Sequence, residues 1–162
     1  MRIELAILRH VEMPLRFRFR TSFGETTIKR FLLLELRSGG LVGWGECVAE
    51  EDPFYASETI ATAREVLLRY LLPLTVGREI PDPEAFELSA ARVRGHRMAK
   101  ATIETALCDL FAKAAGQPLS RWLGGVRSEI EVGVSLGIAP TVRELIANVR
   151  KHVEQGYRRI KL

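Results

Sequence analysis

The sequence has few cysteines and no long apolar run, and its first residues lead us to expect no secretion; each of these features narrows the classes of protein to which the chain can belong. Its two cysteines, Cys47 and Cys108, have neither the spacing of metal ligands nor the density of a disulfide scaffold. No apolar run approaches the roughly 20 residues that a membrane helix needs. Glu4 stands where a signal peptide would have its apolar core. We therefore expect a cytoplasmic protein with reduced thiols and no membrane partner.

The sequence also lacks the signatures of several common enzyme and binding classes. Its histidines show no triad or zinc spacing, and no phosphate-cradling glycine loop or nucleophile elbow is present. The formal net charge is +4, but 24 basic residues are spread among 20 acidic ones. Only residues 16–20 concentrate positive charge. We therefore expect no general nucleic-acid binding.

Hydrophobic periodicity predicts an α+β arrangement for the first part of the chain. Ile3, Leu5 and Ile7 alternate with polar or small residues, which is typical of a half-buried strand. Two further strands are predicted at 28–37 and 41–48, joined by a glycine turn. The period then changes to that of helices. Helices are predicted from Ser57, as the N-cap, to Pro73, from Asp82, also as a cap, onward, and over 98–115. The apolar stripe of the last helix is expected to contain Ala99, Ile103, Ala106, Leu107, Leu110 and Ala114.

Residues 129–162 have a different pattern, in which a strand, a helix and a second strand follow one another. Strands are predicted at 129–137 and 157–162, and Thr141 with Glu144 forms a capping box that opens the helix between them. One βαβ unit needs neighbouring strands and cover on both faces. We therefore expect two domains, 1–125 and 126–162, of which the second is the incomplete beginning of a parallel β/α domain.

Lys161 and Ser135 are the candidate site residues of these two strands. A lysine inside a barrel strand is costly unless it is paired or used, but from the local sequence alone an ordinary surface lysine is the favoured interpretation. Ser135 shares a strand face with Gly133 and Gly137. A face of small residues indicates the close approach of a ligand or of another backbone, and a tightly packed barrel layer explains it equally well.

Residues 16–24 interleave arginine with phenylalanine. If this segment is extended, its arginines share one face. Such a pattern can bind single-stranded nucleic acid, or it can line a pocket for an anionic substrate with an apolar body. An edge strand protected by its charges is the favoured interpretation from the sequence alone.

Several segments, taken together and in this order, resemble the enolase superfamily over essentially the whole chain. Gly-x-Gly-Glu at 43–46 and Leu-Gly-Gly at 123–125 mark the superfamily broadly. Ser-Phe-Gly at 22–24, combined with Val-Gly-Val-Ser-Leu-Gly at 132–137, is similar more narrowly to the o-succinylbenzoate synthase / N-acylamino-acid racemase type. The segment that ends in Lys161 resembles the start of that family's Lys-x-Lys strand.

The resemblance implies an α+β capping domain, made of a three-stranded antiparallel meander and helices, followed by the first strands of a modified (β/α)8 TIM-type barrel. It implies abstraction of a proton α to the carboxylate of a small-molecule substrate, with Mg²⁺ stabilising the enediolate and lysines acting as acid and base. Loss of a hydroxyl as water then gives o-succinylbenzoate, a menaquinone precursor, whereas return of the proton on the opposite face racemises an N-acylamino acid. A homo-oligomer is expected.

The resemblance also assigns roles to individual residues. Lys161 would be the first lysine of Lys-x-Lys, beside the substrate carboxylate, where its like charge lowers the pKa of its partner. Ser135 would face the substrate. The lid over the substrate would be formed by Phe19, Phe23, Gly24 and Tyr55. Glu50 departs from the family pattern, because an apolar residue is expected at that position. The resemblance therefore does not fix the identity of the substrate's side chain.

The second lysine of the motif and the acidic Mg²⁺ ligands are not among these residues, so we expect the metal ligands to lie beyond this chain and the 162 residues alone to be inactive. Two alternatives stay open. Within the superfamily, the activity could be that of a dipeptide epimerase or a muconate-type cycloisomerase. From another class, the chain could be a non-catalytic module that binds nucleic acid or a partner through its arginine and phenylalanine strand.

Overall fold

The computed structural model describes residues 1–22 and 24–162. These residues group by their contacts into two units. The first unit contains residues 1–12 and 30–125, and the second contains 13–29 and 126–162. The domain division predicted from the sequence, 1–125 and 126–162, stays a prediction.

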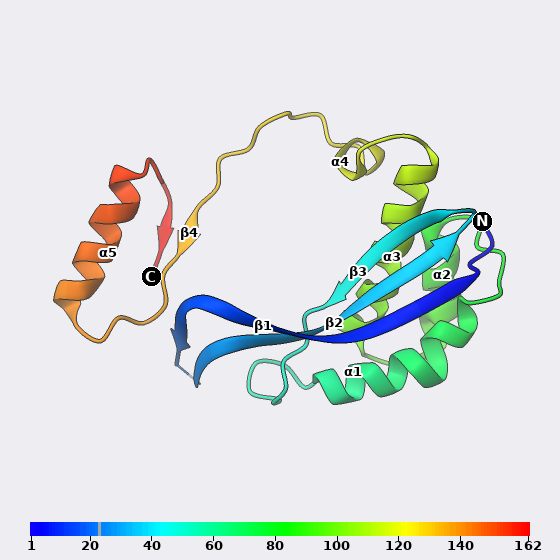
Figure 1. Cartoon of the computed structure of the whole chain (residues 1–162), viewed down its shortest axis with the longest axis horizontal. Coiled ribbons are helices and arrows are strands. Elements are labelled where there is room, and N and C mark those ends of the chain that lie inside the picture. Colours follow the sequence, from blue (N-terminus) through cyan, green and yellow to red (C-terminus); the bar gives the residue numbers. More distant parts are fainter. Residues whose placement is uncertain (23) are drawn as a thin grey trace. The chain divides into compact units, whose positions relative to one another are not determined.

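Three strands form one sheet in the order β1-β2-β3: β1 (Leu5–Thr21), β2 (Gly24–Ser38) and β3 (Leu41–Cys47) (Figure 1). β2 and β3 are antiparallel. The turn between them contains Gly39 and Gly40, whose φ angles of 55° and 77° lie in the left-handed region that glycine adopts without strain. The predicted hairpin is therefore confirmed. β1 lies at an edge of the sheet and continues well beyond the alternating segment at its start.

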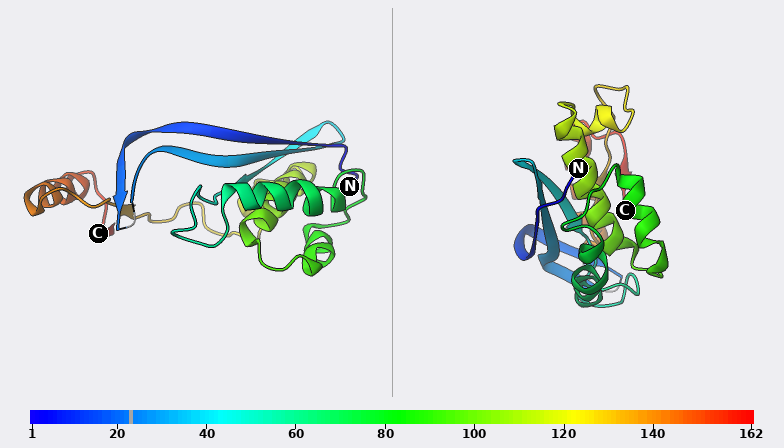
Figure 2. Two further views of the ribbon diagram at one scale, coloured as in Figure 1. Left: turned by 90° about the horizontal axis from the view of Figure 1, so that it is seen from below. Right: turned by 90° about the vertical axis from the view of Figure 1, so that its right-hand side faces the viewer.

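Helical segments follow the sheet along the chain, and α1, α2 and α3 lie on one side of it (Figure 2). The segments are α1 (Ile60–Val66), a π-helical turn η1 (Leu67–Leu71), the 3-10 turns η2 (Leu72–Leu74) and η3 (Ala90–Arg92), α2 (Pro83–Ser89), α3 (Arg97–Ala114) and α4 (Leu119–Trp122).

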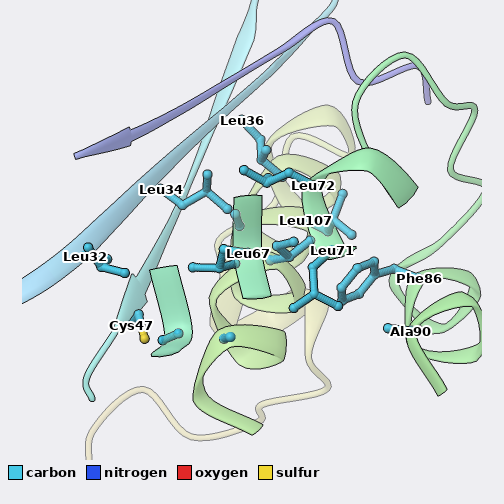
Figure 3. Close-up of a cluster of buried hydrophobic side chains, with 14 of the residues drawn as sticks. Leu32, Leu34, Leu36, Cys47, Leu67, Leu71, Leu72, Phe86, Ala90 and Leu107 are labelled. Carbon is cyan, nitrogen blue, oxygen red and sulfur yellow. The ribbon is translucent and has the colours of Figure 1, made fainter. Parts of the chain in front are cut away.

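The core of the first unit forms between the sheet and these helices (Figure 3). Leu32, Leu34 and Leu36 alternate along β2 and are fully buried, as a strand with one covered face requires. The side chains that meet them come from several helices and from β3, and they include Cys47, Leu67, Leu71, Phe86 and Leu107.

Two helix details differ from the prediction. The N-cap of α1 is Thr59 rather than Ser57, because Thr59 and Thr62 form a reciprocal capping box. On α3, Ala114 is exposed and Ala112 is buried in its place. The predicted cap at Asp82 is confirmed, since its carboxylate accepts a hydrogen bond of 2.8 Å from the N–H of Ala85.

The second unit contains β4 (Val134–Ser135), α5 (Val142–Glu154) and β5 (Ile160–Lys161). β4 and β5 pair in parallel, so the predicted βαβ unit is confirmed, although both strands are shorter than predicted. Thr141 caps α5 by accepting a hydrogen bond of 3.2 Å from the N–H of Glu144. Across the described part of the chain, no helix combines the length and the apolar character needed to cross a membrane.

Candidate functional site

Lys161 and Ser135 lie opposite each other on neighbouring parallel strands. Ser135 of β4 is the register partner of Lys161 of β5. The N–H of Leu136 donates a hydrogen bond of 2.9 Å to the carbonyl of Lys161, which holds the pair in register. Residues in register on adjacent strands point to the same face of a sheet, so the amine and the hydroxyl share one face. Both residues are exposed in the second unit.

The two glycines that flank Ser135 lie against other backbone segments of the same unit. A Cβ atom at Gly133 would lie 3.0 Å from the carbonyl oxygen of Arg159. A Cβ atom at Gly137 would lie 3.1 Å from the nitrogen of Arg20 and 3.5 Å from the ring of Phe19. Of the interpretations open for this face, the close approach of another backbone is therefore the one observed at both glycines.

Phe19 and Gly24, two of the predicted lid residues, belong to the same unit as Lys161. The strand that carries Phe19 contacts the segment after β4, because the N–H of Ile138 donates a hydrogen bond of 2.9 Å to the carbonyl of Arg20. Across the hairpin end, the Thr21 hydroxyl donates to the carbonyl of Gly24 at 3.3 Å. Phe23, the other lid residue predicted here, lies outside the described residues.

Tyr55, the fourth predicted lid residue, lies in the first unit, on the connection between β3 and α1. We call residues 50–59 the aromatic loop, because its two aromatic side chains, Phe54 and Tyr55, are 68% and 70% exposed. Glu50, which departs from the family pattern, stands at the start of this loop and is exposed as well.

Charged residues that the sequence analysis did not single out hold the aromatic loop. Arg30 of β2 donates to Glu51 of the loop at 2.6 Å and to Glu12 of β1 at 2.6 Å. The guanidinium of Arg30 holds the pKa of the Glu12 carboxyl below its usual value, through the hydrogen bond first and through its charge second. Near the other end of the loop, the Glu58 carboxylate accepts hydrogen bonds of 3.0 and 2.8 Å from the N–H groups of Met98 and Ala99.

No local pattern in the sequence could have identified these partners. Glu58 and Ala99 are separated by 41 positions, and Arg30 and Glu51 by 21. The signal that was available is weak. It consists of isolated acids beside the Pro-Phe-Tyr segment, which the sequence alone does not distinguish from ordinary solvated acids.

Within the described residues, 1–22 and 24–162, the cysteines and acids offer neither an activated nucleophile nor a metal site. Cys47 is buried and Cys108 is half-buried, and burial raises the pKa of both thiols, which disfavours the reactive thiolate. Among the residues that the structure describes, no group of three or more His, Cys, Asp or Glu side chains is arranged to hold a metal ion. The described residues therefore do not fit a Mg²⁺ site by themselves.

Comparison with known proteins places these observations in a family. The family model described as the mandelate racemase / muconate lactonizing enzyme N-terminal domain matches residues 2–124. The N-succinylamino acid racemase of Thermus thermophilus is 54% identical over 162 residues, which cover 100% of this chain and 44% of that protein. The o-succinylbenzoate synthase of Geobacillus stearothermophilus is 45% identical over 161 residues, which cover 99% and 43%.

A solved structure agrees with the sequence relatives. The crystal structure of an enolase-superfamily member from Listeria innocua matches with a TM-score of 0.92 and 38% identity, covering 99% of this chain and 43% of that one. The chain thus spans less than half the length of the relatives that it matches. Both the predicted capping-domain fold and the resemblance to synthases and racemases are confirmed. The chain belongs to the mandelate racemase / muconate lactonizing enzyme family of the enolase superfamily.

Proposed function

We propose that the protein which carries this chain removes a proton from the carbon α to a carboxylate, and that it forms o-succinylbenzoate by dehydration, racemises N-acylamino acids, or does both. The observation that carries the proposal is the pairing of Lys161 with Ser135 on one face of β4 and β5. It is supported by relatives that bear the names of a racemase and a synthase. In this proposal 1–125 is the capping domain and 126–162 begins the barrel.

Lys161 acts on the substrate carboxylate in this proposal. Its ammonium attracts the carboxylate and, as a like charge, lowers the pKa of a neighbouring basic lysine so that this lysine can accept the α-proton near neutral pH. Ser135, on the same face, offers a hydroxyl that can donate to a substrate oxygen. In the synthase reaction the α-proton moves to the base, and the hydroxyl takes up a proton from a general acid and leaves as water. In the racemase reaction a proton returns to the opposite face of the carbon.

The lid residues exclude water from this reaction. In this proposal all four lid residues, Phe19, Phe23, Gly24 and Tyr55, are assigned on the strength of the family resemblance. Exclusion of water strengthens the interaction between Lys161 and the carboxylate, because charges attract more strongly in a medium of low polarity.

The remaining properties are proposed from the family resemblance. The protein uses Mg²⁺ whose ligands lie outside the described residues, and no step above is assigned to the metal. The 162 residues alone turn over no substrate. The protein acts in the cytoplasm as a homo-oligomer on a small carboxylate, without a nucleic-acid or membrane partner. Glu50, an exposed acid in the aromatic loop, keeps a dipeptide epimerase with a polar or cationic substrate as the second candidate.

The experiment compares substrates on the purified full-length protein with Mg²⁺ present. We expect turnover of the o-succinylbenzoate precursor or of N-succinylamino acids, and a loss of about 10²–10³-fold in kcat/KM for Lys161→Ala, the range typical of removing one preorganised electrostatic group. Lys151→Ala on the exposed face of α5 is the matched control and should leave kcat/KM unchanged. Turnover of dipeptides or muconate in their place would select the other activities. An unimpaired Lys161→Ala protein would refute the role of the lysine.

A further inference from the structure

The aromatic loop is closed at its base. The carbonyl of Glu50 accepts a hydrogen bond of 2.8 Å from the N–H of Ile60, and Glu50 and Thr59 form a parallel bridge. A surface loop whose ends meet in this way is compact at its base while its tip stays accessible. The tip carries Phe54 and Tyr55.

Packing alone gives the tip of this loop little positional order. None of residues 51–57 is buried. Exposed segments with few buried contacts open locally at low free-energy cost. Contacts that tie such a loop to the sheet or to a helix therefore contribute to where its aromatic side chains lie.

Arg30 supplies a contact of this kind between the aromatic loop and the sheet. It lies on β2, and its guanidinium reaches a carboxylate on each side, Glu12 of β1 through Nε and Glu51 of the loop through Nη1, both at 2.6 Å. An arginine can serve two carboxylates at once because its donors diverge in one rigid plane, whereas a lysine is a point charge on a flexible stem. The Arg30 side chain is 32% exposed and the two carboxylates are 58% and 53% exposed, so the tie depends on its two short charge-assisted hydrogen bonds rather than on exclusion of water.

We propose that Arg30 is a positioning residue, which holds the aromatic loop to β1 and β2 and thereby sets the place of Tyr55 as the lid closes on the substrate. The proposal rests on the proposed function, since it takes Tyr55 as a lid residue. Arg30 itself touches no substrate in this scheme. Its effect therefore appears in substrate binding more than in the chemical step.

The first test measures the loop directly. Amide hydrogen exchange of Ile60, whose N–H closes the base of the aromatic loop by donating to the carbonyl of Glu50, is followed in the full-length protein for Arg30→Gln and Glu51→Gln. The matched control is Arg69→Gln, which breaks the exposed Arg69–Glu65 ion pair of 2.9 Å elsewhere in the same unit. We expect exchange to become about fivefold or more faster in both loop variants and to stay unchanged in the control. Unchanged exchange in Glu51→Gln, a variant at an exposed site that should fold normally, would overturn the proposal.

The second test measures catalysis. We expect Arg30→Gln and Glu51→Gln to raise KM about three- to tenfold while kcat changes less than about twofold, which is the pattern of lost binding rather than lost chemistry. In a Tyr55→Ala background the Glu51→Gln change should add nothing, because both act through the same side chain. Equal effects of Glu51→Gln in both backgrounds would refute the coupling to Tyr55.

The variants distinguish a failure of the positioning role of Arg30 from a failure of the lid role of Tyr55, on which the proposed function depends. If Tyr55→Ala alone leaves kcat/KM unchanged, the lid assignment is wrong, whatever the exchange data show. If Tyr55→Ala impairs binding but Arg30→Gln and Glu51→Gln do not, the lid assignment stands and the positioning role of Arg30 is refuted.

Discussion

Single residues decide how closely helix α3 approaches the sheet. A Cβ atom at Gly43 would lie 2.2 Å from the carbonyl oxygen of Ala106, and one at Gly45 would lie 1.9 Å from that of Thr102. The Gly-x-Gly-Glu signature, which on the sequence level only marks the superfamily, thus has a steric cause in this fold. It lets the backbone of α3 lie directly on β3.

The close approach predicts a large cost for a single methyl group. Gly45→Ala must displace α3 or β3, because the clash is with backbone, and we expect it to lower the free energy of unfolding by about 2–3 kcal/mol. Gly24→Ala is the control, since a Cβ atom there meets nothing within 4 Å. Its effect should stay within about 0.5 kcal/mol. Urea unfolding followed by circular dichroism measures both, and equal midpoints for the two variants would contradict the steric explanation.

At the scale of elements, α3 is held at both of its ends by partners far away in the sequence. Near its C-terminal end, Asp109 accepts a hydrogen bond of 2.9 Å from the N–H of Trp44, and Lys113 donates one of 2.7 Å to the carbonyl of Val42. These two contacts satisfy one N–H group and one carbonyl of β3, an edge strand of the sheet. At the N-terminal end, His96 has a left-handed φ of 48° and makes no side-chain cap, so Glu58 of the aromatic loop takes over that task.

Removing this cap should destabilise the first unit measurably. A carboxylate that binds free N–H groups at a helix N-terminus is favoured by the hydrogen bonds and by the helix dipole together. We expect Glu58→Ala to lower the free energy of unfolding by about 1–2 kcal/mol, in the range found for lost N-caps. Glu65→Ala on the exposed face of α1 should cost less than about 0.5 kcal/mol. Thermal and urea unfolding of both variants check this, and a loss in Glu65→Ala that matches Glu58→Ala would argue against a specific cap.

The elements show what could be predicted from the sequence and why the rest could not. α3 is predicted at 98–115 and observed at Arg97–Ala114, because a long apolar stripe that is followed by Gly116 and Pro118 leaves little freedom in where the helix ends. The hairpin turn at Gly39 and Gly40 followed from the conformations that only glycine adopts easily. Local composition determines such features, so the sequence suffices for them.

Features that depend on distant partners could not be predicted. The cap on α3 comes from Glu58, and the tie of the aromatic loop comes from Arg30, neither of which has a local signature. The N-cap of α1 is two positions from the predicted one, because serine is intrinsically the better cap but the reciprocal bond between Thr59 and Thr62 selects Thr59. For the site, the shared face of Ser135 and Lys161 is observed, whereas the roles of both residues stay predictions.

At the scale of the whole molecule, the two units differ in how much apolar surface they cover. α3 carries a continuous buried stripe that includes Ile103, Leu107 and Leu110. α5 has no buried residue, and its apolar side chains Val142 and Ile146 are 73% and 47% exposed. Burial of such side chains is the main source of helix stability in proteins, since short isolated helices are marginal in water.

This difference predicts unequal protection from amide hydrogen exchange along the 162-residue chain. The 13 residues of α5 are held by their own hydrogen bonds and by little packing, so their amides should exchange at least about 100-fold faster than the central amides of α3. The comparison is internal, because both helices report from one sample under one condition. Exchange followed by NMR or mass spectrometry gives the two values directly. Equal protection of α5 and α3 would mean that the apolar side of α5 is covered in solution, and it would direct the search to what covers it.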